Sequence, residues 1–166
     1  MTADTTGTFT TTGTIEVQRL HPDAVLPTRA HAGDAGLDLV SLERCVLPPG
    51  ERAVVGTGVA VSIPSGWTGL ICPRSGLAAR HGIGVVNSPG VIDSGYRGEV
   101  KVVLHNSDAQ NVFTVEPGDR IAQLVIVPAL HAQVLEVDKL DTATSRASDG
   151  FGSTGGFANS SSEPGE

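Results

Sequence analysis

The chain of 166 residues is acidic, with 11 Lys and Arg against 18 Asp and Glu and a formal net charge of -7. This length suits one domain with a single core, and the charge argues against a nucleic-acid-binding surface, because duplex binding depends on cationic contacts to phosphate. No apolar run is long enough to cross a bilayer, and the Thr-rich start lacks the features of a secretory signal. We therefore expect a cytoplasmic protein that contacts neither membrane nor nucleic acid.

Short β-rich runs separated by Gly and Pro turns fill most of the chain, whereas no segment sustains the apolar period of a long helix. In chain order, strands are predicted at 15–20, 37–41, 52–63, 67–72, 83–86, 99–105, 111–115, 120–127 and 133–137. One helical turn is predicted at 75–80, with Ser75 as its N-cap. Many short strands at fairly even spacing predict an all-β sandwich, jelly roll or small barrel.

The two ends differ from the middle in composition. Residues 1–13 and 159–166 are mostly small and polar, with almost no apolar side chains to bury. We expect a flexible N-terminal tail at 1–13, a β domain at 14–140 and a C-terminal arm at 141–166 whose end, 159–166, is disordered. The two cysteines, Cys45 and Cys72, form no disulfide framework and are expected to pack as small hydrophobic residues.

Four loop segments combine glycine with a charged or hydroxyl side chain, a composition that lets backbone amides approach a phosphate. They are residues 35–38, 73–76, 90–98 and 146–155. Any one of them alone is explained as an ordinary turn between strands. Together, in this order and with 118–124 as a further segment, they resemble the five ordered motifs of the trimeric dUTP diphosphatase (dUTPase) family of bacterial type, over residues 14–157.

This resemblance implies a fold, an assembly and a reaction. The fold is a distorted β jelly roll of the β-clip or dUTPase-like type with one short helix, and the assembly is a homotrimer whose active sites lie between subunits. The reaction is Mg²⁺-assisted attack of water on the α-phosphate of dUTP, which gives dUMP and pyrophosphate. Such an enzyme supplies a precursor of dTTP and keeps uracil out of DNA, and a lone subunit is expected to be inactive.

The motif at 87–99 implies the site for the base and the sugar. Its hairpin backbone is expected to pair with the uracil edge as an added strand would, and its bulk is expected to exclude a 5-methyl group. Tyr96 matches a tyrosine that packs under deoxyribose, and the alternative reading is a core aromatic residue. The predicted residues of this site are Asn87, Gly90, Val91, Ile92 and Tyr96, and Lys101, which follows the motif, is a further predicted substrate-binding residue.

Asp93 in the same motif matches the family's catalytic aspartate, which holds the attacking water and bonds the sugar 3′-hydroxyl. A carboxylate suits this role because it accepts a proton from water and its charge orients that water. The alternative reading is the side-chain acceptor of an Asx-turn. The motif context favours the catalytic role.

The phosphate-binding residues implied by the resemblance come from two motifs. Arg74 and Ser75, with Gly76, match the group that binds the α- and β-phosphates. The alternative, a helix cap beside a surface arginine, is compatible with this reading because a helix N-terminus itself favours an anion. Gln123 matches the glutamine that positions the water and the α-phosphate, which makes it a catalytic candidate. Arg120 follows a turn and reads equally well as a structural ion-pair residue, so it is left out of the predicted site.

Asp38 matches an aspartate that bonds to a water molecule on magnesium. No cluster of His, Cys or carboxylate residues in the sequence has the spacing of a dedicated metal cage. Magnesium commonly keeps several waters and binds through substrate phosphates. We therefore expect Mg²⁺ to arrive with the nucleotide.

The last motif implies an arm that closes the active site of a neighbouring subunit. Its matching residues are Arg146, Phe151, Gly152, Ser153 and Thr154. Arg146 resembles a catalytic arginine finger on the γ-phosphate, and Phe151 resembles an aromatic residue stacked on uracil. Composition alone reads this stretch as a frayed tail. Ala147 and Asp149 stand where the family usually has glycines, and Asp149 adds negative charge near the triphosphate.

Two other functions fit parts of the pattern. A dCTP deaminase shares the fold but acts on the base, whereas the hairpin with Asp93 and Tyr96 fits the diphosphatase better. A catalytically silent nucleotide-binding homologue would need neither Asp93 nor Arg146, and both are present. The products formed from dUTP and dCTP distinguish these possibilities.

Overall fold

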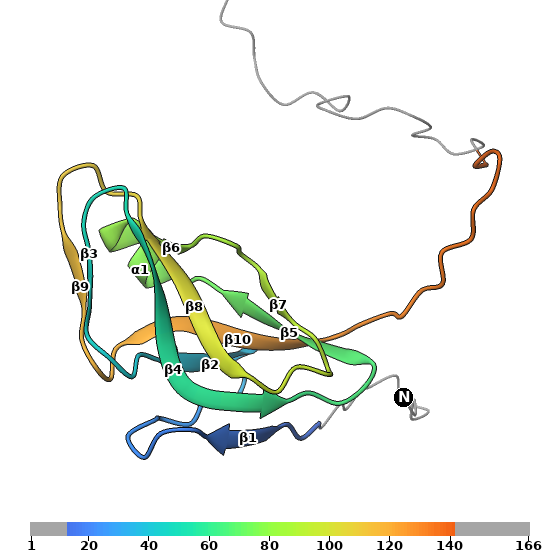
Figure 1. The fold of residues 1–166 in the computed structure, drawn as a ribbon, viewed down its shortest axis with the longest axis horizontal. Coiled ribbons are helices and arrows are strands. Elements are labelled where there is room, and N and C mark those ends of the chain that lie inside the picture. Colours follow the sequence, from blue (N-terminus) through green and yellow to red (C-terminus); the bar gives the residue numbers. More distant parts are fainter. Residues whose placement is uncertain (1–12, 142–166) are drawn as a thin grey trace, which may run out of the picture. The chain divides into compact units, whose positions relative to one another are not determined.

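The computed structural model describes residues 13–141, and almost all of their regular structure is β (Figure 1). The elements in chain order are β1 (Glu16–Arg19), β2 (Gly36–Val40), β3 (Cys45–Leu47), β4 (Arg52–Ser62), β5 (Trp67–Cys72), α1 (Ser75–His81), β6 (Ile83–Val85), β7 (Gly90–Ile92), β8 (Glu99–Asn106), β9 (Phe113–Val115) and β10 (Arg120–Pro128). All of them belong to a compact unit that ends at His131. The segment 132–141 belongs to a second unit and contains no helix or strand.

The strands form antiparallel sheets that enclose one core. One sheet has the order β1-β4-β8-β6, another has the order β2-β10-β5-β7, and β3 pairs with β9. Leu39 and Leu124 of the second sheet belong to the same buried cluster as Val55 and Leu104 of the first. In β8, buried and more exposed residues alternate along the strand, which is the pattern of a strand with one face on a core.

The all-β class with one short helix is confirmed, and all of the predicted strands except 133–137 are present. The prediction at 133–137 is wrong for this structure. A strand needs a neighbour to satisfy its backbone, and no strand pairs with this segment among the described residues. Val134 and Leu135 there are 99% and 82% exposed, so the apolar pattern has no core to face.

Helix α1 begins one residue earlier than the predicted cap implied. Arg74, with an extended backbone, is the N-cap and gives no side-chain cap hydrogen bond, so the prediction of Ser75 as N-cap is wrong. The helix ends at Gly82, whose left-handed backbone at φ 65° suits a residue without a Cβ. Within the part of the chain that the structure describes, no helix is long and apolar enough to cross a membrane.

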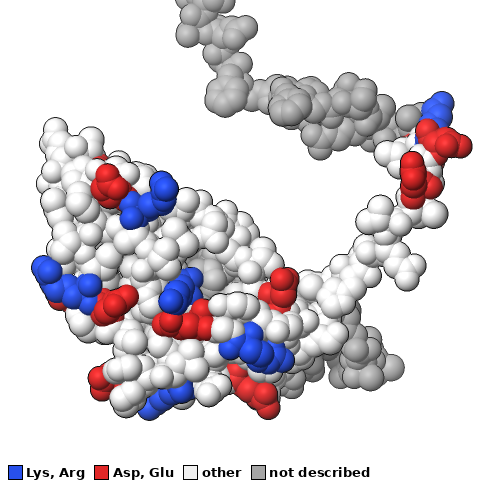
Figure 2. Space-filling model, viewed as in Figure 1, with Lys and Arg blue, Asp and Glu red and all other residues white. Residues whose placement is uncertain are grey.

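The charges on the surface are mixed rather than segregated. Figure 2 shows acidic and basic side chains next to one another in small groups on the face drawn, with no broad basic area among the coloured residues. Ion pairs such as Arg44–Glu116 at 3.1 Å account for part of this pattern. This face therefore lacks the basic stripe that a nucleic-acid-binding surface requires.

Candidate active site

A first cavity, of about 210 Å³, lies beside β7 and β8. Its lining residues are Ile71, Asn87, Gly90, Val91, Ile92, Tyr96, Glu99, Val100, Lys101 and Val103. Every residue predicted for the base and sugar site is in this group. The structure therefore brings together side chains from β7, from the following turn and from β8, and we call this space the base cavity.

Strand β7 gives the base cavity an edge that can bind a ligand. It stands at the end of its sheet and, among the strands of residues 13–141, pairs only with β5, with Val91 opposite Leu70. The outward N–H and C=O groups of an edge strand have no partner in the sheet. A planar group with alternating donors and acceptors, such as a pyrimidine edge, can pair with them as an added strand does.

Tyr96 forms one wall of the base cavity and is held in place by the turn around it. Its hydroxyl donates to the Glu99 carbonyl at 2.9 Å, and the residue is 45% exposed. A Cβ added at Gly98 would lie 2.7 Å from the ring carbon Cζ, so glycine at this position leaves room for the ring. The exposure excludes the reading of Tyr96 as a core aromatic residue.

Asp93 lies in the turn that follows β7, directly after the cavity residue Ile92. Its carbonyl accepts the N–H of Tyr96 at 3.0 Å, and Arg97 donates to the Ser94 and Tyr96 carbonyls at 2.7 Å, which closes the turn. No hydrogen bond reaches the Asp93 carboxylate from residues 13–141, so an Asx-turn is not seen among them. The exposed carboxylate is available to accept a proton from water.

A second cavity, of about 340 Å³, is lined by charged side chains. Its lining residues are Ala30, Asp34, Ala35, Gly36, Asp38, Arg74, Ser75, Gly76, Arg120, Gln123 and Val125. Strand β10 lies between β2 and β5, and Gln123 is opposite both Asp38 and Cys72. This register brings the predicted residues of three separate motifs into what we call the phosphate cavity.

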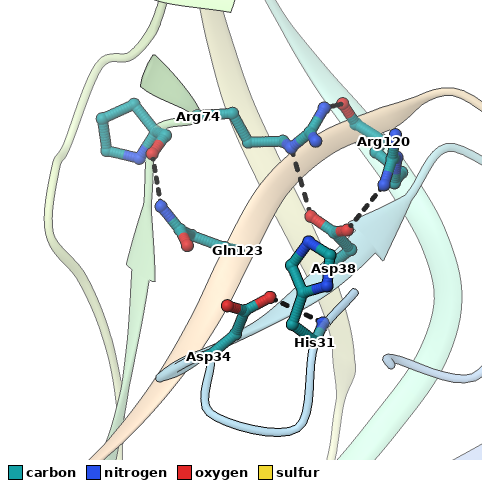
Figure 3. A network of polar contacts seen from close by, with 7 residues as sticks. His31, Asp34, Asp38, Arg74, Arg120 and Gln123 are labelled. Atoms are coloured by element: carbon teal, nitrogen blue, oxygen red, sulfur yellow. Dashed lines mark hydrogen bonds and ion pairs between the residues drawn. The ribbon is translucent and has the colours of Figure 1, made fainter. Parts of the chain in front are cut away.

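Asp38 is bound by two guanidinium groups in the phosphate cavity (Figure 3). Its Oδ1 lies 3.1 Å from Arg74 Nε and its Oδ2 lies 3.2 Å from Arg120 Nη1. Arg74 also donates from Nη1 to the Arg120 carbonyl at 3.1 Å. The Asp38 side chain is only 17% exposed, which strengthens both pairs relative to surface ion pairs. Both cations are thus held in place by contacts within the chain.

Arg120 is a cavity residue that the sequence reasoning left out. The ion pair considered for it does exist, but the partner is Asp38 and the pair lines the phosphate cavity. A register shift between Arg120 and Ala122 interrupts the regular pairing of β10 with β2. Strand alternation therefore gave no signal that Arg120 and Gln123 line the same cavity.

Asp34 is a second carboxylate of the phosphate cavity that the sequence reasoning missed. Its Oδ2 accepts the N–H of His31 at 2.8 Å, and its carbonyl accepts Arg29 Nε at 2.7 Å. Gln123 is also fixed, because its Nε2 donates to the Pro73 carbonyl at 3.0 Å. The composition of the loop before β2 gave only a weak signal, a glycine-flanked Asp in 33–36.

The donor set of the phosphate cavity fits a hydrated magnesium ion that is bound through a ligand's phosphates. No group of His, Cys, Asp and Glu residues within 13–141 could hold a metal ion on its own. The carboxylate oxygens of Asp34 and Asp38 can nevertheless accept hydrogen bonds from water molecules that are bound to a hard cation. Magnesium commonly keeps several such waters. The residues present therefore fit an ion that keeps its water molecules.

Comparison with known proteins identifies the family. A family model described as dUTPase matches residues 23–155. This chain belongs to the dUTPase family. The expected resemblance is thereby confirmed on most of the chain.

Related dUTPases are known from bacteria and phages. This chain is 56% identical to a deoxyuridine 5'-triphosphate nucleotidohydrolase of Thermobifida fusca, and the match covers 87% of this chain and 80% of that protein. A protein of the same name from Mycobacterium marinum is 55% identical, over 87% of this chain and 96% of that one. Among solved structures, the dUTPase of Staphylococcus bacteriophage 80alpha with dUPNHPP has a TM-score of 0.80 at 35% identity, over 87% and 99% of the two chains.

The dUTPase fold of the chain is therefore supported by structure as well as sequence. A mutant dUTPase from phage phi11 of S. aureus, whose description includes a structural Mg(II) ion, has a TM-score of 0.72 at 32% identity over 76% of this chain and 98% of that one.

The predicted residues of the closing arm lie outside the residues that the structure describes. They are Arg146, Phe151, Gly152, Ser153 and Thr154, together with Ala147 and Asp149.

Proposed function

We propose that this dUTPase-family chain hydrolyses dUTP to dUMP and pyrophosphate. The observation that carries the proposal is the base cavity, where the free edge of β7 stands beside Tyr96. A uracil edge pairs with the β7 backbone, and the deoxyribose packs on the exposed Tyr96 ring. The names of the bacterial relatives and the dUPNHPP complex of the phage enzyme support this substrate.

The reaction is an attack of water on the α-phosphate. The water oxygen forms a bond to the α-phosphorus, the bond from that phosphorus to the bridging oxygen breaks, and pyrophosphate leaves with the electron pair. Asp93 accepts the proton of the attacking water, and Gln123 orients that water against the phosphate. Arg74 stabilises the charge that develops on the phosphate oxygens, which is the main catalytic need in such a displacement.

Magnesium supplies charge neutralisation on the phosphate oxygens when it is bound with the triphosphate. Asp38 and Asp34 are the residues that would hold its water molecules in the phosphate cavity. The structural Mg(II) ion described for the phage phi11 enzyme supports this cofactor. Arg146 is proposed to neutralise the γ-phosphate, with Phe151 on the base and Gly152, Ser153 and Thr154 on the terminal phosphate.

We also propose a homotrimer with shared sites, acting in the cytoplasm without a membrane or nucleic-acid partner. The base cavity and the phosphate cavity have no lining residue in common, although one nucleotide must contact both. An assembly that sets the base cavity of one subunit against the phosphate cavity of another solves this problem. Exposed apolar residues support such an assembly, among them Leu130 at 91% and Val134 at 99%.

Product analysis across the deoxynucleotides tests the proposal. The full chain is incubated with dUTP, dCTP, dTTP or UTP, with Mg²⁺ or with a chelator, and pyrophosphate and ammonia are measured. We expect pyrophosphate from dUTP alone, and much less of it with the chelator. Ammonia from dCTP would instead indicate a deaminase, and nucleotide binding without any product would indicate a silent homologue.

A further inference from the structure

Glu99, the first residue of β8, contacts three parts of the base cavity region at once. Its Oε1 accepts the N–H of Gly58 at 2.9 Å, and its Oε2 lies 3.3 Å from Lys101 Nζ. Its carbonyl accepts the hydroxyl of Tyr96 at 2.9 Å. One residue thus links β4, Lys101 on its own strand and the Tyr96 turn.

The contact to Gly58 anchors Glu99 at an irregularity in β4. Pairing with β8 runs from Gly56 opposite Lys101 to Ala60 opposite Glu99, so the β4 residues between them have no regular partners in β8. Gly58 there has φ 67°, and the Glu99 carboxylate satisfies its N–H. A Cβ added at Gly56 would lie 2.8 Å from Glu99 Oε1, so the carboxylate fills space left by that glycine.

The contact to Lys101 acts inside the base cavity. Residues two apart on a strand point to the same face, and both Glu99 and Lys101 line the cavity. The Glu99 side chain is 25% exposed and the Lys101 side chain 55% exposed, so a more sheltered carboxylate holds a more exposed ammonium group. The pair also balances the charge of a cavity that receives an uncharged base.

We propose that Glu99 is a positioning residue for the nucleoside part of the substrate. Its carboxylate fixes the ammonium group of Lys101 and anchors the start of β8 to the irregular part of β4, while its backbone carbonyl, which the side chain thereby holds in place, accepts the Tyr96 hydroxyl. The proposal rests on the proposed function, because the ligand of the base cavity is taken to be a deoxyuridine nucleotide. The phosphate cavity contains none of these residues, so loss of Glu99 should weaken nucleoside binding and spare phosphate binding.

Titration calorimetry with two probes, dUMP and inorganic pyrophosphate, tests the role of Glu99 on the full chain with Mg²⁺. Glu99→Gln keeps an oxygen that can accept from Gly58 but removes the charge that holds Lys101. We expect the Kd of dUMP and the KM of dUTP to rise about threefold, as loss of a partly exposed ion pair allows. The Kd of pyrophosphate and kcat should stay unchanged. An equal rise for both probes, or no rise for dUMP, would overturn the proposal.

A double-mutant cycle with Lys101→Met separates positioning from general damage. If Glu99 acts through Lys101, then Glu99→Gln should have little further effect on dUMP binding in the Lys101→Met background. Additive effects would contradict the proposal. Glu116→Gln is the matched control, since it removes the ion pair with Arg44 and touches neither cavity. Failure of the unmodified chain to release pyrophosphate from dUTP would instead refute the proposed function.

Discussion

At the scale of single residues, the polar side chains of the phosphate cavity are held by contacts within the chain itself. Asp38 holds Arg74 and Arg120 through separate oxygens, and Gln123 is fixed by the Pro73 carbonyl. Groups held in place in advance stabilise a transition state without a cost of reorganisation. The chain has a formal net charge of -7, so these local guanidinium groups, rather than the overall charge, must attract an anionic substrate.

Arg120 should matter less than Arg74 for turnover. The Arg120 side chain is 53% exposed and has one ion-pair contact, whereas Arg74 is 28% exposed and has contacts to Asp38 and to the Arg120 carbonyl. We expect Arg74→Gln to lower kcat/KM by about 100-fold, and Arg120→Gln by about tenfold, in the range of charge-assisted hydrogen bonds. Steady-state pyrophosphate release measures both. Equal losses would show that Arg120 contacts the phosphates as directly as Arg74.

Asp93 should affect chemistry rather than binding. Its carboxylate is exposed and makes no hydrogen bond with residues 13–141 in this structure, so Asp93→Asn should leave the fold intact. Loss of a general base typically lowers the rate by about 10²–10⁴-fold, and we expect kcat to fall by this amount. Calorimetry with a non-hydrolysable dUTP analogue should show nearly unchanged affinity. Asp23→Asn, another exposed aspartate, is the control, and full activity of Asp93→Asn would refute the catalytic role.

At the scale of elements, the long strands could be predicted because their apolar residues alternate with more polar ones and because turn residues mark both of their ends. Short or irregular features carried less signal. Strand β3 has only three residues, and the register shift at Arg120 is set by tertiary pairing rather than by local pattern. Residues 133–137 have strand composition but no partner strand among the described residues. The cavity-lining residues of the motifs within 13–141 could be named from the sequence, whereas Asp34 and Arg120 were recognised as cavity residues only from the structure.

The turn between β7 and β8 offers a test of how the Tyr96 wall is built. Gly98→Ala would place a Cβ within 2.7 Å of the Tyr96 ring, whereas a Cβ at Gly95 in the same turn meets nothing within 4 Å. Because the ring must move, we expect Gly98→Ala to raise the KM of dUTP about tenfold, which corresponds to about 1.4 kcal/mol. Gly95→Ala should change it little. Equal effects of the two variants on KM would show that the turn backbone, not the ring position, controls binding.

At the scale of the whole molecule, the decisive property is that the two cavities have separate linings. Under the proposed function a nucleotide contacts the base cavity, with Asp93 next to it, and the phosphate cavity with Arg74, yet none of the residues in 13–141 lines both. The order of the motifs along the chain does not by itself say which of them line a common cavity, and the expectation of sites between subunits came from the family resemblance. The assembly therefore has to be tested with the proposed active site as the reporter.

Mixing two inactive variants gives that test. Asp93→Asn chains keep Arg74, and Arg74→Gln chains keep Asp93, so a site shared between subunits contains both native residues in some mixed trimers. After co-refolding equal amounts, random assembly should restore about a quarter of the native sites and of the native activity. Light scattering should give the mass of a trimer for each preparation. A site built within one chain would give no recovery, because every chain in the mixture lacks one of the two residues.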